Sequence, residues 1–219
     1  MSPRVGPSGP LSRDRIVEAA IDLADEGGLE VVTMSRVAAN LEAGAMSLYR
    51  HVAGKEDLLV AMVERVTSDF SYPDRDGLDW RGCMHALAEQ DRASFHAHPW
   101  MLVATATVTP PFGTASLAAM EWALDVLEAV GIPSADAARA IMTINNYVQG
   151  SARVALGESS DAISDDPGHA WRERLQDADL AAFPRLHRLI AGPGPAADRD
   201  WFADGLDLIL DGLQRCIRR

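Results

Sequence analysis

The sequence predicts an all-α protein, with a small N-terminal domain of short helices and a larger helical bundle after it. Apolar residues recur at helical spacing in segment after segment, and no stretch shows the alternation of a strand. Breaks containing Gly and Pro separate these segments. The third observation is the stretch Thr33–Asp57, which has the pattern of two very short helices joined by a tight corner and followed at once by a third.

The composition is that of a globular protein, since 47% of the 219 residues are hydrophobic and 24% are charged. The net charge of −12 argues against a general nucleic-acid coat protein. No apolar run approaches the roughly 20 residues that span a bilayer, and the N-terminus lacks an apolar signal-peptide core. We therefore expect a cytoplasmic protein with a disordered arm at residues 1–10. Cys83 and Cys216 are expected to be reduced thiols.

The first predicted helix runs from an N-cap at Ser12 to about Glu26. One face of it is apolar and should turn toward the core, with Ile16, Ala19, Ala20 and Leu23. Gly27-Gly28 should end the helix, because glycine readily adopts the left-handed conformation found after a helix C-terminus.

The two short helices form the most informative part of the sequence. Thr33 can cap the first, which carries the apolar residues Val37, Ala38 and Leu41, and the second is predicted over Ala45–His51. Helices this short are marginal alone in water, so neighbouring elements must hold them. The second would present small, aromatic and basic side chains. This arrangement is typical of a helix-turn-helix that reads the major groove of DNA.

The candidate DNA-binding residues lie on these helices and at the start of the next one. Met46 and Ser47 are at the N-terminal end of the second helix, where base edges are usually reached. Arg50 suits either a guanine edge or a phosphate, and His51 suits a phosphate or the helix C-terminus. The full predicted set is Ser35, Arg36, Ala45, Met46, Ser47, Tyr49, Arg50, His51 and Lys55.

Leu48-Tyr49-Arg50-His51-Val52, followed by Gly54-Lys55-Glu56-Asp57-Leu58-Leu59, resembles the signature of the TetR family of bacterial transcriptional repressors. The resemblance is close over Leu11–Val66 and extends as a helix pattern over the remainder. It implies that the Tyr49 hydroxyl and Lys55 reach DNA phosphates. It also implies that the helix Lys55–Asp69 joins the reading head to a regulatory core.

One position departs from the family pattern. The family usually has Gly at the turn position that is Glu42 here. A left-handed backbone costs a non-Gly residue roughly 1–2 kcal/mol, so we predict that this corner is built differently.

The rest of the chain divides into a linker and a series of helices. The polar segment 71–77, with Pro and Gly, is the predicted linker. Residues 11–70 are then a DNA-binding domain with its connecting helix, and residues 71–219 are a ligand-binding and dimerisation domain. Helices are predicted over 80–97, 100–108, 114–130, 135–156, 169–182, 183–190 and 199–217, with Ser134 as an N-cap.

The resemblance implies a ligand pocket among the helices between residues 80 and 156. Asn145 and Asn146 are adjacent amides in an apolar run, and they need partners if buried, either from a ligand or across a dimer. The residues do not match the tetracycline-binding set, so neither that drug nor its magnesium is predicted, and no cofactor is. The predicted ligand-binding set is His85, His96, Trp100, Met101, Phe112, Trp122, Met142, Asn145, Asn146 and Gln149.

The last helix carries an apolar stripe of Phe202, Leu206, Ile209, Leu210 and Leu213. Gly205 and Gly212 would permit close approach of another element. The resemblance implies a homodimer through a four-helix bundle that uses this helix and the helix 135–156; the alternative is a core helix of one chain. A dimer would place two recognition helices about one DNA turn apart on a near-palindromic operator.

No catalytic or metal site is predicted. Ser94 and Ser151 lack a G-x-S-x-G context, and His96-x-His98 with Asp91 upstream lacks a third ligand at a recognised spacing. The sequence predicts a DNA-binding transcriptional repressor that a small-molecule inducer releases from its operator. The alternatives are an all-α enzyme and a helical protein-interaction adaptor with a non-functional head. Loss of the phosphate contacts of Tyr49 or Lys55 would impair only the DNA-binding protein.

Overall fold

The computed structural model describes residues 9–70, 72–73, 77–105, 113–157, 175, 178–192 and 200–217. These residues form helices and turns and contain no strand, which confirms the all-α prediction. The chain falls into two compact units, Met1–Leu127 and Glu128–Arg219. Most of the predicted arm and linker, Phe112 and residues 169–174 and 176–177 lie outside the described residues. The predicted helix 169–182 is wrong over its last five residues, because 178–182 form a bend and a turn instead of helix.

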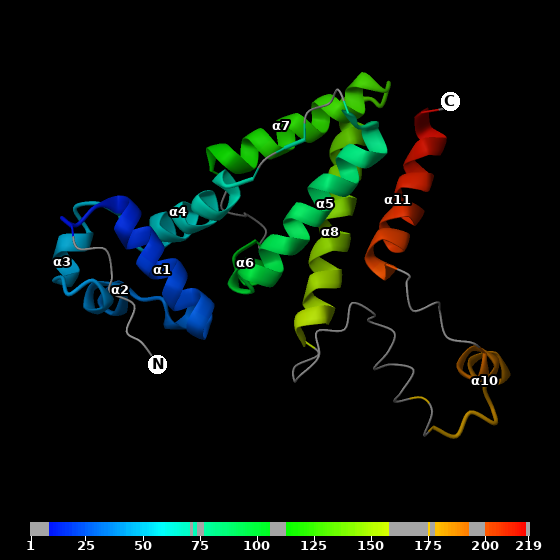
Figure 1. Ribbon diagram of the computed structural model, residues 1–219, viewed down its shortest axis with the longest axis horizontal. Coiled ribbons are helices and arrows are strands. Elements are labelled where there is room, and N and C mark those ends of the chain that lie inside the picture. The colour runs from blue at the N-terminus through cyan, green and yellow to red at the C-terminus, as the bar shows by residue number, and fades with distance from the viewer. Residues whose placement is uncertain are drawn as a thin grey trace. The chain divides into compact units, whose positions relative to one another are not determined.

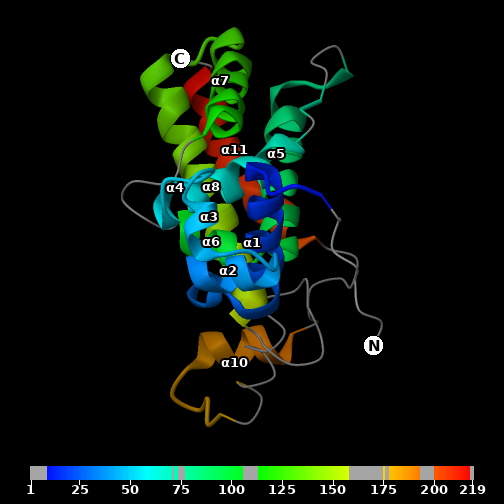
Figure 2. The same cartoon turned by 90° about the vertical axis from the view of Figure 1, so that its left-hand side faces the viewer.

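The first four helices form what we call the head. Helix α1 packs along α4, and α2 contacts both α1 and α3 (Figure 1). Figure 2 looks onto the end of this unit that carries α2 and α3. The elements are α1 (Arg13–Gly27), the 3-10 turn η1 (Leu29–Val31), α2 (Met34–Asn40), α3 (Ala45–Leu48) and α4 (Lys55–Ser68).

The predicted helix ends are present. The hydroxyl of Ser12 accepts a hydrogen bond from the N–H of Arg15 (3.3 Å), and the hydroxyl of Thr33 accepts one from the N–H of Arg36 (3.2 Å). Gly28 follows α1 with φ +79°, which confirms a glycine C-cap. These caps satisfy backbone groups that helix ends otherwise leave unpaired.

The corner between α2 and α3 differs from the prediction. Glu42 adopts the left-handed conformation itself, with φ +52°. The N–H of Ala43 donates to the carbonyl of Ala38 (2.9 Å), and that of Glu42 donates to Ala39 (3.2 Å). These are the two bonds of a Schellman motif, and they offset the roughly 1–2 kcal/mol of the left-handed backbone.

The recognition helix α3 is shorter than predicted, ending at Leu48 instead of His51. The next N–H groups bond three residues back, Arg50 to Ser47 (3.4 Å) and His51 to Leu48 (2.8 Å). Bonds of this kind tighten the last turn of a helix. Tyr49, Arg50 and His51 therefore lie on a turn that continues α3.

The remainder of the first unit consists of three helices. Helix α5 begins and ends where the sequence predicts, and the carboxylate of Asp79 caps it by accepting from the N–H of Gly82 (2.8 Å). The carboxylate of Glu64, on α4, accepts from the N–H of Ala115 (2.9 Å) at the start of α7. The helices are α5 (Trp80–Ala97), α6 (Trp100–Thr105) and α7 (Thr114–Ala129).

In the second unit, α8 (Ser134–Gly157) and α11 (Trp201–Ile217) lie side by side (Figure 1). The ring of Tyr147 stacks on Phe202 at 5.4 Å, and its hydroxyl donates to the Phe202 carbonyl (2.9 Å). A Cβ at Gly205 would collide with that hydroxyl, so this glycine permits the close approach, whereas Gly212 has open space. The described part of this unit also contains α10 (Pro184–Ala191).

The start of α8 differs from the prediction by one residue. Ser134 is the first residue of α8 instead of its N-cap, because the N–H of Ala137 reaches the carbonyl of Pro133 (2.9 Å).

No helix among the described residues has the length and apolarity needed to cross a membrane.

Candidate functional site

Helix α3 has an inward and an outward face. Leu48 is fully buried and Val52 is 1% exposed, and together they anchor the segment in the head. On the other side, Met46 is 79% exposed and Tyr49 is 48% exposed. Met46 in the one-turn helix and Tyr49 on the turn after it therefore keep much of their surface accessible. The outward face is therefore available to a partner.

The other predicted DNA-binding residues lie on α2, on α3 and the turn after it, and at the start of α4. Ser35 and Arg36 are exposed in the first turn of α2, and Lys55 is exposed at the first residue of α4. Arg50 is exposed on the turn after α3. The remaining members, Ala45, Ser47 and His51, are partly exposed. Their individual DNA contacts remain predictions.

An ion pair holds the recognition segment against α1. The guanidinium of Arg13 donates to both carboxylate oxygens of Asp57 (2.8 and 2.6 Å) and to the carbonyl of His51 (2.9 Å). The N–H of Ala53 also donates to Asp57 (2.8 Å). The hydrogen bond from Arg13, and then that from Ala53, lower the pKa of Asp57 to about 2. These contacts of Arg13 and Asp57, which we call the clamp, tie α1 to both ends of the loop between α3 and α4.

A second polar contact joins α1 to α6. The carboxylate of Asp25, near the end of α1, pairs with Nδ1 of His98 (2.8 Å) and accepts from the indole N–H of Trp100 (2.8 Å). Trp100 is 2% exposed and Met101 is also buried. Both were predicted as walls of a ligand pocket. Burial gives both residues a structural role here, and Trp100 adds its hydrogen bond to Asp25.

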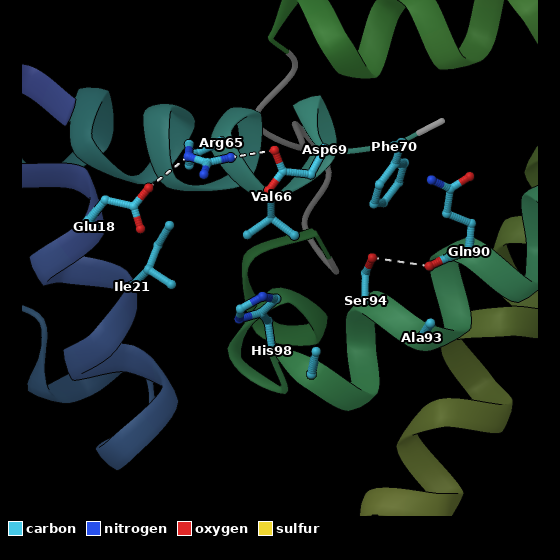
Figure 3. Close-up of a pocket in the computed structure, with 11 residues that line it drawn as sticks. Glu18, Ile21, Arg65, Val66, Asp69, Phe70, Gln90, Ala93, Ser94 and His98 are labelled. Atoms are coloured by element: carbon cyan, nitrogen blue, oxygen red, sulfur yellow. Dashed lines mark hydrogen bonds and ion pairs between the residues drawn. The ribbon is translucent and has the colours of Figure 1, made fainter. Parts of the chain in front are cut away.

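A groove of about 470 Å³ lies where α1, α4 and α5 meet. Figure 3 shows Arg65 of α4 between Glu18 of α1 (2.7 Å) and Asp69 of α4 (2.6 Å), with the His98 ring across the groove. None of the predicted ligand-binding residues that the structure describes lines it. Its lining is Glu18, Ile21, Arg65, Val66, Asp69, Phe70, Gln90, Ala93, Ser94, Ala97 and His98.

The predicted ligand-binding residues are divided between the two units. His85, His96 and Trp122 are partly exposed in the first unit. Trp100 and Met101 are buried in α6 of the same unit, and Phe112 lies outside the described residues. The remaining four belong to α8 of the second unit, where Met142 and Asn146 are exposed and Asn145 and Gln149 are partly exposed. Because Asn146 is exposed in the single chain, its amide needs no partner from that chain, and the prediction that a ligand or a second protomer supplies one stays a prediction. The set as a whole remains a prediction.

Two polar side chains of the first unit lie outside the predicted sites. Asp91 is on the inward stripe of α5, and burial raises its pKa to about 7. The hydroxyl of Tyr72 is buried without a hydrogen-bond partner in the described part of the chain. A charged residue at core spacing in α5 was a signal for Asp91 in the sequence. Across the described residues, no cluster of three or more His, Cys, Asp or Glu side chains could hold a metal ion.

Comparison with known proteins assigns the chain to a family. Residues 16–62 match the sequence model of bacterial regulatory proteins of the tetR family, and residues 72–217 match the tetracyclin repressor-like C-terminal domain. The chain belongs to the TetR family. It is a ligand-responsive, DNA-binding transcriptional regulator of the repressor type, and not an enzyme. The predicted boundary between residues 70 and 71 falls between the two matches and remains a prediction.

Individual TetR relatives cover nearly the whole chain. The transcriptional repressor DrrR1 of Streptomyces coeruleorubidus is 36% identical over 97% of this chain and 80% of its own length. The class A tetracycline repressor protein from transposon 1721 of Escherichia coli is 28% identical over 94% of this chain and 91% of its own. The structure of ActR from Streptomyces coelicolor with actinorhodin has a TM-score of 0.77 at 26% identity, covering 96% of this chain and all of that one.

Proposed function

We propose that this TetR-family regulator acts in the cytoplasm as a homodimeric repressor, with α3 of each protomer in one major-groove half-site of a near-palindromic operator. The observation that carries the proposal is the outward face of α3, where Met46 and Tyr49 are exposed while Leu48 is fully buried. A one-turn helix held rigidly by its inward residue presents its outward residues in a fixed geometry. Fixed presentation is what base-edge recognition requires.

The exposed cations make such binding electrostatically reasonable despite the acidic chain. Arg36, Arg50 and Lys55 are all exposed around α3. Phosphate contacts are local, so a few cations at the surface suffice even when the net charge is −12. Arg13 adds no further contact, because Asp57 engages its guanidinium.

The dimer surface is proposed on the outward sides of α8 and α11. Of the predicted dimerisation residues, Phe202, Leu206 and Leu210 are buried within the second unit, so one chain already accounts for them. Ile209 and Leu213 are partly exposed. Three other large apolar residues of these helices are strongly exposed, and a second chain could cover them: Met142, Val154 and Leu208.

Ligand response is proposed to reach DNA through the contacts of α1 and α4 with the rest of the first unit. The Glu64 carboxylate joins α4 to the first turn of α7, and the Asp25 carboxylate joins α1 to His98 and Trp100. A ligand that prefers one arrangement of α6 and α7 would thereby shift the population of head orientations. Strong release needs a preference of several kcal/mol. The complex of ActR with actinorhodin supports a small-molecule inducer here.

Selection of random duplex DNA by the purified protein tests the proposal. We expect enrichment of a near-palindrome whose half-sites are about one helical turn apart. Arg50→Ala should distinguish the two predicted roles of that residue. Loss of a base contact would relax specificity at one position by about 1–3 kcal/mol, whereas loss of a phosphate contact would weaken all sequences and reduce the salt slope by about 1.

Two further variants complete the experiment. Tyr49→Phe removes only a hydroxyl and should weaken operator binding by about 0.5–1.5 kcal/mol. Arg185→Ala, an exposed arginine on α10 of the second unit, is the matched control and should leave binding unchanged. If protein freed of small molecules enriches no symmetric sequence at low salt, the operator model is wrong.

A further inference from the structure

The groove where α1, α4 and α5 meet, which we call the junction groove, has no part in the proposed function. It has a volume of about 470 Å³, and all of its lining residues belong to the first unit. Small-molecule sites are typically cavities of about 300–1,000 Å³ with an apolar lining and a few polar groups. The junction groove has this size, and the predicted ligand-binding residues of the described chain lie elsewhere.

Apolar side chains from all three helices line the junction groove. Ile21 of α1 is buried, and Val66 of α4 and Phe70, just after that helix, are partly exposed. Helix α5 contributes two exposed alanines, Ala93 and Ala97. Because an alanine side chain ends at Cβ, α5 leaves room in the groove. An apolar body of moderate size would be covered on several sides there.

Two carboxylates at the junction groove share one guanidinium (Figure 3). Nε of Arg65 donates to Oε1 of Glu18 (2.7 Å), and Nη1 donates to Oδ1 of Asp69 (2.6 Å). The second oxygen of each carboxylate has no hydrogen bond among the described residues. Both free oxygens are therefore available as acceptors for a bound molecule.

Two further polar groups line the junction groove and have capacity to spare. Nδ1 of His98 pairs with Asp25 (2.8 Å), while Nε2 has no partner in the described chain. The side-chain amide of Gln90 likewise makes no hydrogen bond to a described residue. Figure 3 shows Gln90 and Phe70 at one end of the groove and Glu18 at the other. Polar groups thus occur on more than one side of the apolar lining.

The charges around the junction groove sum to a negative value. Three carboxylates, those of Glu18, Asp69 and Asp25, stand against the single guanidinium of Arg65. The formal charge is −3 + 1 = −2 when His98 is neutral and −1 when it is protonated. This local field attracts cations and repels anions.

We infer that the junction groove is a second binding site, and that it takes a small organic cation with a primary amine on an apolar body. The ammonium donates to the oxygens of Glu18 and Asp69 that Arg65 leaves free. The apolar body lies against Val66, Phe70 and the small side chains of α5. The molecule would contact the head and α5 at once. The inference does not rest on the proposed operator binding.

The lining favours this class of ligand over the other classes. An anion would meet the negative field, and the guanidinium nitrogens nearest to it already donate to carboxylates. A metal ion would leave the apolar lining uncovered, and the described residues offer it no cluster of three or more His, Cys, Asp or Glu side chains. Because the side chains of Glu18 and Asp69 are 52% and 69% exposed, water screens their charge. The charge should therefore change affinity severalfold and not by orders of magnitude.

Calorimetric titration of the full-length, DNA-free protein with two naphthalenes tests the inference. 2-Naphthylmethylamine is a cation at neutral pH, and 2-naphthylmethanol is a neutral molecule of nearly the same shape. We expect the amine to bind about fivefold tighter than the alcohol. In the double variant Glu18→Gln/Asp69→Asn, the two compounds should bind within about twofold of each other, because only the amine loses an interaction.

A steric variant locates the site independently of charge. Ala93→Trp places an indole in the junction groove and should weaken both compounds by about tenfold or more, because filled space excludes a ligand. Ala93 is exposed, so the larger side chain should not disturb the core. The matched controls are Ala118→Trp and Glu121→Gln, both at exposed positions of α7, and they should leave both affinities unchanged.

Four results would overturn the inference. If neither compound binds saturably, the junction groove is not a site for this class of molecule. If amine and alcohol bind equally to the wild type, the cation is wrong. If the amine binds but Ala93→Trp leaves its affinity unchanged, the amine occupies another place. If Glu121→Gln costs as much as the double variant, the attraction is general. Operator selection is carried out without either compound, so its outcome judges the proposed function separately.

Discussion

Asp57 in the head and Asp91 in α5 are carboxylates of the same compact unit with opposite surroundings. Asp57 accepts hydrogen bonds from Arg13 and from a backbone N–H, and its pKa is lowered to about 2. Asp91 accepts none among the described residues, and its pKa is raised to about 7. The difference teaches that an ion pair and a backbone hydrogen bond favour the charged carboxylate in the head, whereas burial disfavours it in α5.

The largest expected effect tests how firmly the head fixes α3. Leu48→Ala should lower the free energy of unfolding by about 2–5 kcal/mol, because it leaves a cavity in a fully packed site. Met46→Ala, on the exposed side of the same helix, should change it by less than about 0.5 kcal/mol. Urea denaturation of both variants measures the contrast. Similar values for the two would show that α3 is not anchored by its inward residue.

Replacing Asp91 should change the free energy of unfolding in the opposite direction. Asp91→Leu should raise the unfolding free energy of the ligand-free protein by about 1–3 kcal/mol, the range for an unsatisfied buried polar group. For a chain of this size each kcal/mol raises Tm by about 2–4 °C. Scanning calorimetry would detect it. A lower Tm in Asp91→Leu would mean that Asp91 is structurally satisfied, and the comparison with Asp57 would fail.

The pH dependence sharpens the same point. The folded pKa of Asp91 lies above its ordinary value of 3.8, so the folded state binds the extra proton between pH of about 4 and about 7. Its contribution to stability therefore falls as pH rises through that window. Asp91→Asn should remove this decline in unfolding free energy. A wild-type decline that persists unchanged in Asp91→Asn would assign it to other groups.

Two tyrosines extend the comparison to the second unit. The hydroxyl of Tyr147 donates to the carbonyl of Phe202, whereas that of Tyr72 has no partner in the described chain. Tyr147→Phe should therefore lower the unfolding free energy by about 0.5–1.5 kcal/mol, while Tyr72→Phe should be neutral or stabilising. Thermal unfolding of the matched pair gives the result. Equal destabilisation of both would mean that the Tyr72 hydroxyl is satisfied after all.

The smallest expected change in unfolding free energy comes from the ion pair between Arg13 and Asp57. The depressed pKa of Asp57 contributes stability above a pH of about 4, and this is lost as pH falls toward 2. Because both partners are about one-third exposed or more, the pair is worth about 0.2–1 kcal/mol. Asp57→Asn should reduce the wild-type's loss of unfolding free energy between those pH values. Identical acid titrations of the two proteins would contradict a stabilising clamp.

The sequence by itself determined the elements and the reading surface. Helical periodicity and capping residues are local, so Ser12, Thr33 and the bounds of α5 could be placed without a structure. The exposure of Tyr49 and Arg50 also followed, because a short helix with Leu48 turned inward must turn other residues outward.

Tertiary structure decided which polar groups are satisfied. Whether Arg13 meets Asp57, or Asp25 meets His98 and Trp100, depends on helices separated by tens of residues in the chain. The left-handed Glu42 likewise depends on hydrogen bonds that only the folded corner forms. The core spacing of Asp91 is visible in the sequence, but whether its carboxylate has a partner is decided by the residues that pack around it. Such pairing is non-local, and no spacing within one helix encodes it.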